Sequence, residues 1–296
     1  MTREANISSP KLRSVNEAIY CEYDGRARLV PSMALLDQYP ELTATVIEAG
    51  EFNLRWGPQI PLRFFPREMT QALMRQRICR HLEGDGIEFG AGPRPLEIPP
   101  YCRVRYADRF TAAEFTRQSS AARGSHSRYV DIDLVDRIED MASLCTRSID
   151  FVIASHVIEH LSNPIKMFKT AYDRLRAKGK LVLVIPDMER TFDAGRAVTS
   201  LDHLLLDYNS PSRERDIDHY LEYEASVLRT APDDQRIAAE KRWLNLEDIH
   251  LHTFTFQSFT MLSSWICQNV GFSKVWSDPG RFAAEQTNEF YFVFTK

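Results

Sequence analysis

Residues 86–93 read Gly86-Ile87-Glu88-Phe89-Gly90-Ala91-Gly92-Pro93, and the rest of the chain is organised around this stretch. Its apolar residues alternate and then run into closely spaced glycines, which predicts a buried strand that ends in a tight turn. Glycines let a backbone approach a ligand where a side chain would collide with it. Asp108 follows 18 residues after Gly90, and an acid at the end of the next strand can accept hydrogen bonds from ribose hydroxyls. The stretch therefore indicates a site for a nucleotide-like cofactor.

Apolar strands alternate with helix-forming segments after this turn. The expected strands are residues 87–89, 104–107, 129–132, 151–154 and 181–185. Asn163-Pro164 predicts a helix start, with an N-cap followed by proline at the first helical position, and Gly179 is expected to close that helix. Because continuous apolar strands that alternate with helices form parallel sheets covered on both faces, the pattern predicts an α/β fold with a doubly wound, mostly parallel, Rossmann-like sheet.

The last third of the chain departs from this alternation. Residues 188–250 are charged and helix-prone, and they are too long for an ordinary connection, so we expect a helical lid inserted into the domain. A helix over residues 259–270, capped by Gly271, should follow. The apolar residues 275–276 and 290–294 have no helix between them, which predicts an antiparallel C-terminal hairpin at one edge of the sheet.

The segment before the glycine stretch carries no pattern that points to chemistry. Residues 1–67 are therefore predicted to form an N-terminal cap, and residues 68–296 the main domain that contains the lid. Two β-prone runs, residues 43–48 and 51–56, are separated by an alanine–glycine pair and predict a hairpin. A helix is expected to begin near Pro66.

The composition limits the class of protein and its partners. The chain has 296 residues, 44% of them hydrophobic, which is ordinary for a globular core. Its net charge is −4 and its arginines are scattered, which disfavours nucleic acid as a partner. The five cysteines show no metal-finger spacing and are expected to be reduced thiols. Without an early apolar run, we expect neither a signal peptide nor a membrane span, and a cytoplasmic location.

Two further stretches resemble the class I S-adenosylmethionine-dependent methyltransferases, specifically their type 11 group. They are Ser148-Ile-Asp-Phe-Val-Ile-Ala-Ser-His-Val-Ile-Glu-His-Leu161 and Arg174-Leu-Arg-Ala-Lys-Gly-Lys-Leu-Val-Leu-Val-Ile-Pro-Asp187. The glycine stretch also looks like a bacterial branch of this family that is often found beside glycan-building enzymes. The chain departs from the family pattern at Arg94, where a third glycine is usual, and at Glu88, where many members have aspartate.

The resemblance implies S-adenosylmethionine as the cofactor and a role for each matching residue. Glu88 would lie under the cofactor's amino group, Asp108 would hold the ribose, and Asp131 or Asp133 would lie near the adenine amine. The residues that would bind the cofactor are Glu88, Gly90, Ala91, Gly92, Asp108, Asp131, Ile132, Asp133 and Ser155.

Histidines are the candidates for the chemistry of methyl transfer. The cofactor's sulfonium already activates the methyl group, so the protein must align the acceptor and, for a hydroxyl, remove its proton. His156 ends a strand at the edge of the sheet where ligands bind, and it is the first candidate for the base. His160 and His250 are the next candidates, although each histidine could equally serve packing alone.

A metal ion is the other chemistry that these residues allow. His156-x-x-Glu159-His160 matches a zinc peptidase pattern, but its place at a strand exit argues against a peptidase. In related methyltransferases a divalent ion can acidify the acceptor hydroxyl, and here Glu159, His160 and His252 could hold one. The spacing does not decide this. His250 and His252 would point to one face if the chain is extended there.

We therefore expect an S-adenosylmethionine-dependent methyltransferase that methylates a hydroxyl on a sugar, a glycan precursor or a small metabolite. The expected partner is that small-molecule or glycan acceptor, and a homo-oligomer is compatible with the sequence. One alternative is an NAD-dependent oxidoreductase, which the sixth position of the glycine motif disfavours because Pro95 stands there. The other is a non-catalytic binding subunit with a degenerate methyltransferase fold, which the change at Arg94 leaves open.

Overall fold

A computed structural model of the chain describes most of its residues. These are residues 11–15, 18–23, 26–29, 47–48, 55–56, 67–111, 113–114, 129–280 and 287–296. The chain divides into two compact units. One comprises Met1–Leu73 with Phe282–Gln286, and the other Met74–Arg281 with Thr287–Lys296.

The first unit contains a five-stranded sheet in the order β4-β1-β2-β3-β5. Its strands are β1 (Lys11–Val15), β2 (Ala18–Tyr23), β3 (Arg26–Leu29), β4 (Ile47–Glu48) and β5 (Arg55–Trp56). The predicted hairpin between residues 43–48 and 51–56 is wrong. Of these runs the structure describes residues 47–48 and 55–56, and these do not pair with each other: β4 pairs in parallel with β1 and β5 in parallel with β3, at opposite edges of the antiparallel β1-β2-β3 meander.

The second unit is built on a seven-stranded sheet in the order β11-β12-β10-β9-β6-β7-β8. Its strands are β6 (Asp85–Phe89), β7 (Arg103–Asp108), β8 (Leu134–Val135), β9 (Ile149–Ser155), β10 (Leu175–Pro186), β11 (Lys274–Asp278) and β12 (Glu289–Thr295). All pairs are parallel except those of β12 with β10 and β11. The predicted doubly wound α/β sheet with an antiparallel C-terminal hairpin is confirmed.

The third strand lies later in the chain than predicted. It was expected at residues 129–132, but only β8 joins β7, with Ala107 opposite Leu134. The Val130 amide instead donates to the Gly92 carbonyl in the glycine turn. Residues 129–132 are therefore held against the turn, and the ladder begins only after them.

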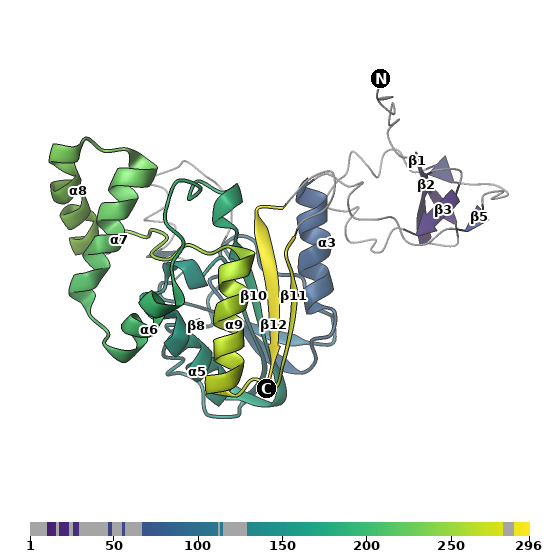
Figure 1. The fold of residues 1–296 in the computed structure, drawn as a ribbon. Coiled ribbons are helices and arrows are strands. Elements are labelled where there is room, and N and C mark those ends of the chain that lie inside the picture. Colours follow the sequence, from purple (N-terminus) through teal and green to yellow (C-terminus); the bar gives the residue numbers. More distant parts are fainter. Residues whose placement is uncertain are drawn as a thin grey trace, which may run out of the picture. The chain divides into compact units, whose positions relative to one another are not determined.

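Helices α5 (Pro164–Arg174) and α9 (Phe256–Val270) lie on one face of this sheet, and the part of α3 (Arg67–Cys79) that belongs to this unit lies on the other (Figure 1). Asn163 caps α5 as predicted, because its side chain accepts from the Lys166 amide. The predicted helix end at Gly179 is wrong. The helix ends at Arg174, because Leu175, with a ψ of 140°, is already extended and begins β10, which also contains Gly179.

The connection from β10 to α9 is helical, as predicted for residues 188–250. Its elements are η3 (Met188–Arg190), α6 (Leu201–Asn209), η4 (Arg213–Arg215), α7 (Asp216–Tyr223), the π-helix η5 (Glu224–Leu228) and α8 (Pro232–Leu244). Tyr220 and Ala239 form a small core with Ile249 and Leu251. We call this connection the insertion. No described helix is long and apolar enough to cross a membrane.

Candidate active site

A cavity of about 750 Å³ lies at the carboxyl ends of β6, β7 and β9. This is the edge at which parallel α/β sheets bind their ligands, and the volume is that of a small-molecule site. Gly90, Gly92 and Asp108 form one part of its wall. Tyr220 and Trp243, from the insertion, form another. The insertion therefore encloses the space that the glycine turn opens.

The conformation of the glycine turn strongly favours glycine. Gly90 has a φ of 69° and Gly92 a φ of 56°, which side chains other than glycine rarely adopt. A Cβ at Gly90 would lie 2.5 Å from Cγ2 of Val157. At Gly92 the nearest neighbour, Cε1 of Tyr129, would be 3.9 Å away, an ordinary van der Waals distance, so a side chain is disfavoured there by the backbone conformation and not by a collision. Ala91 between them is buried and does not line the cavity.

Glu88 supports the glycine turn from within the protein. Its carboxylate accepts the Leu96 amide at 3.1 and 3.2 Å, and the residue is fully buried. Burial raises the pKa of Glu88 to about 8, although the Leu96 hydrogen bond and the charge of Arg75 lower it. Glu88 is not among the residues that line the cavity. The structure thus gives it a contact that fixes the loop after the glycines.

Asp108 ends β7 and lines the cavity, as the sequence predicts. One carboxylate oxygen accepts the amide of Arg109 at 2.7 Å. Burial raises the pKa of Asp108 to about 6, against the hydrogen bond and charge of Arg109, which lower it. At neutral pH the side chain is therefore an ionised acceptor for hydroxyl donors.

The wall beyond Asp108 comes from residues that the sequence analysis missed. Asp131 and Asp133 line a separate hollow, and the Asp133 carboxylate accepts the Tyr106 amide at 2.8 Å. Because β8 lies later than predicted, the loop after it supplies the cavity wall instead, through Asp136, Arg137, Ile138 and Glu139. Ile132 and Ser155 do not line the cavity. The sequence gives no signal for this loop, because β8 has only two residues, between Asp133 and Asp136, and is too short to show a periodic pattern.

His156 follows β9 in a strained conformation, with a φ of 54°. Its Nε2 lies 2.9 Å from Oε2 of Glu289, a buried residue of β12. Two hydrogen bonds from Arg75 hold that carboxylate, at 2.9 and 2.7 Å. Burial would raise the pKa of Glu289, but the hydrogen bonds from His156 and Arg75 lower it to about 2. Glu289 therefore stays ionised and fixes the orientation of the imidazole.

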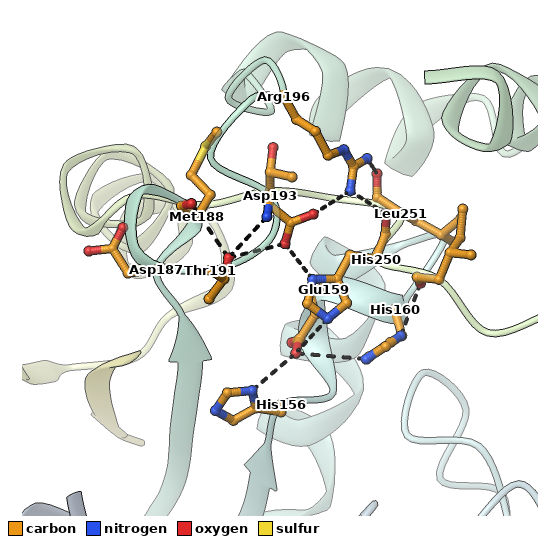
Figure 2. Close-up of polar contacts among 12 residues, drawn as sticks. His156, Glu159, His160, Asp187, Met188, Thr191, Asp193, Arg196, His250 and Leu251 are labelled. Atoms are coloured by element: carbon orange, nitrogen blue, oxygen red, sulfur yellow. Dashed lines mark hydrogen bonds and ion pairs between the residues drawn. The ribbon is translucent and has the colours of Figure 1, made fainter. Parts of the chain in front are cut away.

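Glu159 lies at the centre of three histidines (Figure 2). Its Oε1 is 3.7 Å from Nδ1 of His156, 3.8 Å from Nε2 of His160 and 3.9 Å from Nε2 of His250. The carboxylate is buried, and neither oxygen has a hydrogen-bond partner among the described residues. Glu159, His160 and His250 also offer ligand atoms within 4.8 Å of one another, so they could hold a divalent cation.

His160 is a cation rather than a base at neutral pH. Its Nδ1 lies 3.1 Å from Oδ1 of Asp248 and 3.0 Å from the carbonyl oxygen of Ile249. Burial would lower the pKa of His160, but the Asp248 hydrogen bond and the charge of Glu159 raise it to about 9. His160 lines the cavity and can donate to a ligand or stabilise a negative charge there.

His250 is held from the opposite side by Asp193. Its Nδ1 lies 2.6 Å from Oδ2 of Asp193, and Arg196 binds the other carboxylate oxygen at 2.9 Å. Burial would raise the pKa of Asp193, but these two partners lower it. His250 does not line the cavity, so its Nε2 reaches the site only by way of Glu159.

His250 and His252 point into different groups of side chains. Residues 249–255 form no strand, so the alternation expected for an extended segment does not apply. The His252 amide donates to the Glu159 carbonyl, but its ring lies with His203 and His219. The predicted grouping of Glu159, His160 and His252 is therefore not formed, and His250 takes the third place.

The chain matches a family and resembles known structures. A family model described as a methyltransferase domain matches residues 62–275. A SAM-dependent methyltransferase from Thermotoga maritima shares 17% identity over 79% of this chain and 91% of its own, with a TM-score of 0.38. One from Archaeoglobus fulgidus shares 14% identity over 78% and 95%, also with a TM-score of 0.38. No curated protein matches the chain. On the family match, which spans most of its length, the chain belongs to the class I S-adenosylmethionine-dependent methyltransferases.

Proposed function

We propose that this methyltransferase O-methylates a hydroxyl group of a sugar, a glycan precursor or another small metabolite. The observation that carries the proposal is that one cavity contains both the glycine turn with Asp108 and the side chain of His156. A cofactor on the turn and an acceptor beside the histidine would then share one enclosed space.

The residues of the turn fit S-adenosylmethionine. Gly90 and Gly92 line the cavity without side chains, so a ligand can approach their backbone, and Asp108 offers a buried carboxylate for ribose hydroxyls. Ile138 and Asp136, on the loop after β8, line the cavity and would hold the adenine. When bound, the cofactor supplies a methyl group that its sulfonium has already activated.

His156 is the proposed base. With Nε2 bound to the ionised Glu289, the neutral imidazole keeps its proton on that nitrogen and presents Nδ1 as the acceptor. A hydroxyl placed at Nδ1 can give up its proton as the oxygen attacks the methyl carbon. The left-handed backbone of His156 supports this role, because such strain concentrates at functional sites.

His160 and His250 support this step in different ways. The cationic His160 can donate a hydrogen bond to the acceptor or to the cofactor's carboxylate. His250, fixed by Asp193, lies behind Glu159 and would help to hold the side chain of Glu159 in place beside His156. His250 would therefore act as a positioning residue, since it does not reach the cavity.

The wall that the insertion contributes suits a polyhydroxylated acceptor. Tyr220 and Trp243 supply aromatic surfaces, and Asp216 and Asp248 supply carboxylates that accept from hydroxyls. We infer that residues 188–250 act as a lid over the acceptor. Three expectations stay predictions. They are that residues 1–67 form a cap, that the protein forms a homo-oligomer, and that it is located in the cytoplasm.

The test measures methyl transfer from radiolabelled S-adenosylmethionine to a panel of sugars, nucleotide sugars, phenols, carboxylic acids and amines. We expect incorporation with hydroxyl acceptors and a product that survives mild alkali, as a methyl ether does and a methyl ester does not. His156→Gln should lower kcat at least about 100-fold, the usual contribution of a general base. His81→Gln, which changes an exposed histidine outside the cavity, is the matched control.

Transfer only to amines or carboxylates, or an unchanged kcat in His156→Gln, would refute the proposed acceptor or the proposed base. A protein that binds the cofactor but transfers to no acceptor would favour the non-catalytic alternative. Binding of NAD in place of the cofactor would favour the oxidoreductase, which the family match makes the weaker alternative.

A further inference from the structure

A second group of titratable side chains lies in the insertion, apart from the three histidines around Glu159. We call it the histidine–aspartate cluster, and its members are His203, Asp207, His219 and His252. His203 and Asp207 are one turn apart on α6, His219 is on α7, and His252 is in the segment that returns to α9. The proposed methyl transfer uses none of them.

The four side chains converge on one point. Nε2 of His203 lies 3.3 Å from Nε2 of His219 and 3.2 Å from Oδ2 of Asp207. Nε2 of His252 lies 3.9 Å from the same Asp207 oxygen, and all four ligand atoms are within 4.8 Å of one another. A tetrahedral zinc ion with bonds of about 2.0–2.1 Å would separate its ligand atoms by roughly 3.4 Å. The distances of 3.2, 3.3 and 3.9 Å between the ligand atoms of the cluster are close to this separation.

The burial of unpartnered atoms is a separate observation that points to a ligand. The ring of His252 is fully buried, and neither of its nitrogens makes a hydrogen bond of good geometry among the described residues, although the main chain of Ser162 lies near the ring. Oδ2 of Asp207 is also buried, and the polar atoms near it are the ring nitrogens of His203 and His252, with neither of which it makes a hydrogen bond of good geometry. Leaving a buried polar group unpaired costs about 1–3 kcal/mol. These atoms face one another across the point where a cation would satisfy all of them.

We propose that the histidine–aspartate cluster is a structural zinc site that fastens helices α6 and α7 of the insertion to the segment that returns to α9. Three imidazoles and a carboxylate form a donor set that zinc accepts, and four protein ligands leave no open coordination position. The site would therefore hold structure together rather than take part in methyl transfer.

The protonation of the cluster is consistent with metal binding. Burial lowers the pKa of His219 to about 4, helped by the charge of His203. Burial also lowers the pKa of His252 well below its ordinary value, with the other two histidines and Arg196 acting in the same direction and the Ser162 main chain in the opposite one. Both rings are thus neutral, as ligands must be. Asp207 raises the pKa of His203, and the ion would displace that proton.

The surroundings show what the ion would fix. Arg215 lies 3.4 Å from Oδ1 of Asp207, which leaves Oδ2 for the metal, and the Asp207 carbonyl accepts from the Asn163 side chain at 3.1 Å. Asp207 also lines the cavity. The ion would join α6, α7 and the segment after α8, and it would hold the acceptor wall in place.

The test is metal analysis of the full-length protein, purified without chelators, by plasma mass spectrometry. We expect one zinc ion per chain, and a lower Tm after chelation that Zn²⁺ restores and Mg²⁺ does not. Titration of the stripped protein with Co²⁺ should give the intense visible bands of a tetrahedral site. His203→Gln, at a half-exposed position, and the isosteric Asp207→Asn should each weaken binding at least about tenfold.

Two further variants assign the ion to one cluster. His250→Gln changes the group around Glu159 and should keep the bound ion, as should His81→Gln. X-ray absorption of the zinc-loaded wild-type protein should show nitrogen and oxygen ligands in fourfold coordination, a result that needs no variant to fold. Absence of a stoichiometric ion in the isolated and the titrated protein, or an ion that is lost in His250→Gln and retained in His203→Gln, would overturn the proposal.

Discussion

The pKa of Asp108 allows a quantitative prediction for cofactor binding. Burial raises this pKa to about 6, while Arg109 lowers it and Asp248 raises it further. Only the ionised carboxylate accepts hydrogen bonds from both ribose hydroxyls. The cofactor should therefore bind more weakly as the pH falls through about 6, because Asp108 becomes protonated and loses its charge.

The size of the effect follows from the ionised fraction. With a pKa of about 6, roughly 97% of the side chain is ionised at pH 7.5 and roughly 9% at pH 5. The Kd for S-adenosylhomocysteine should therefore rise about tenfold between these values, which corresponds to about 1.4 kcal/mol. Calorimetric titration at half-unit intervals of pH, at constant ionic strength, measures this curve.

Two variants identify the group that titrates. Asp108→Asn should bind more weakly at pH 7.5 and show a nearly flat profile between pH 5 and 7.5. It should also raise the Tm of the free protein at pH 7.5, because the raised pKa means that burial of the ionised side chain destabilises the fold there. Asp216 lines the same cavity and burial raises its pKa to about 6, so Asp216→Asn is the matched control. The reasoning is refuted if Asp108→Asn keeps the wild-type profile or if Asp216→Asn loses it.

Three further variants test the framework of the site. Gly90→Ala should lower stability by about 1–3 kcal/mol and weaken cofactor binding, because its Cβ would meet Val157 at 2.5 Å. Gly195→Ala, with no neighbour closer than 4.0 Å, should be close to neutral in the same thermal melts. Glu289→Gln should cost about 3–5 kcal/mol in urea unfolding at pH 7, because it leaves Arg75 without its buried partner. Since the pKa of Glu289 is lowered to about 2, the stability that it contributes is present above pH 4.5 and is lost as the pH falls toward 2, and a penalty that persists unchanged at acid pH would contradict this account. Arg196→Met should cost a similar amount because it removes the buried one of the two partners of Asp193, whereas Arg236→Met, which breaks an exposed pair with Glu240, should cost at most about 1 kcal/mol. Equal losses in the two arginine variants would show that burial of the ion pair does not matter here.

The sequence predicted those features of the fold that depend on the conformational preference of a single residue. The glycine turn, the Asn163 cap and the left-handed Gly271 each follow from the conformation that one residue type permits. Strand β8 was misplaced because a two-residue ladder carries no periodicity, and its position is set by the contact of Val130 with the glycine turn. Tertiary pairing likewise overrode the predicted hairpin around residues 49–50.

The candidate site was predictable only in part, for the same reason. Asp108 and His156 lie at strand ends, where topology alone brings side chains to the binding edge. Glu289 reaches His156 from the last strand, and Asp193 reaches His250 from the start of the insertion. No sequence spacing links these segments, so their pairing required the structure. His203 and Asp207 were not singled out from the sequence, because their spacing of one helical turn gains meaning only from the approach of His252.

The most direct test of the central claim is a calorimetric titration of the full-length protein with S-adenosylhomocysteine, with NAD as the parallel ligand. The claim is that the cavity beside Gly90, Gly92 and Asp108 holds the methyl donor. It predicts one S-adenosylhomocysteine bound per chain, no heat from NAD, and a binding signal weakened in Asp108→Asn. A folded protein that binds no S-adenosylhomocysteine, or that binds it equally well without the Asp108 carboxylate, would contradict the claim.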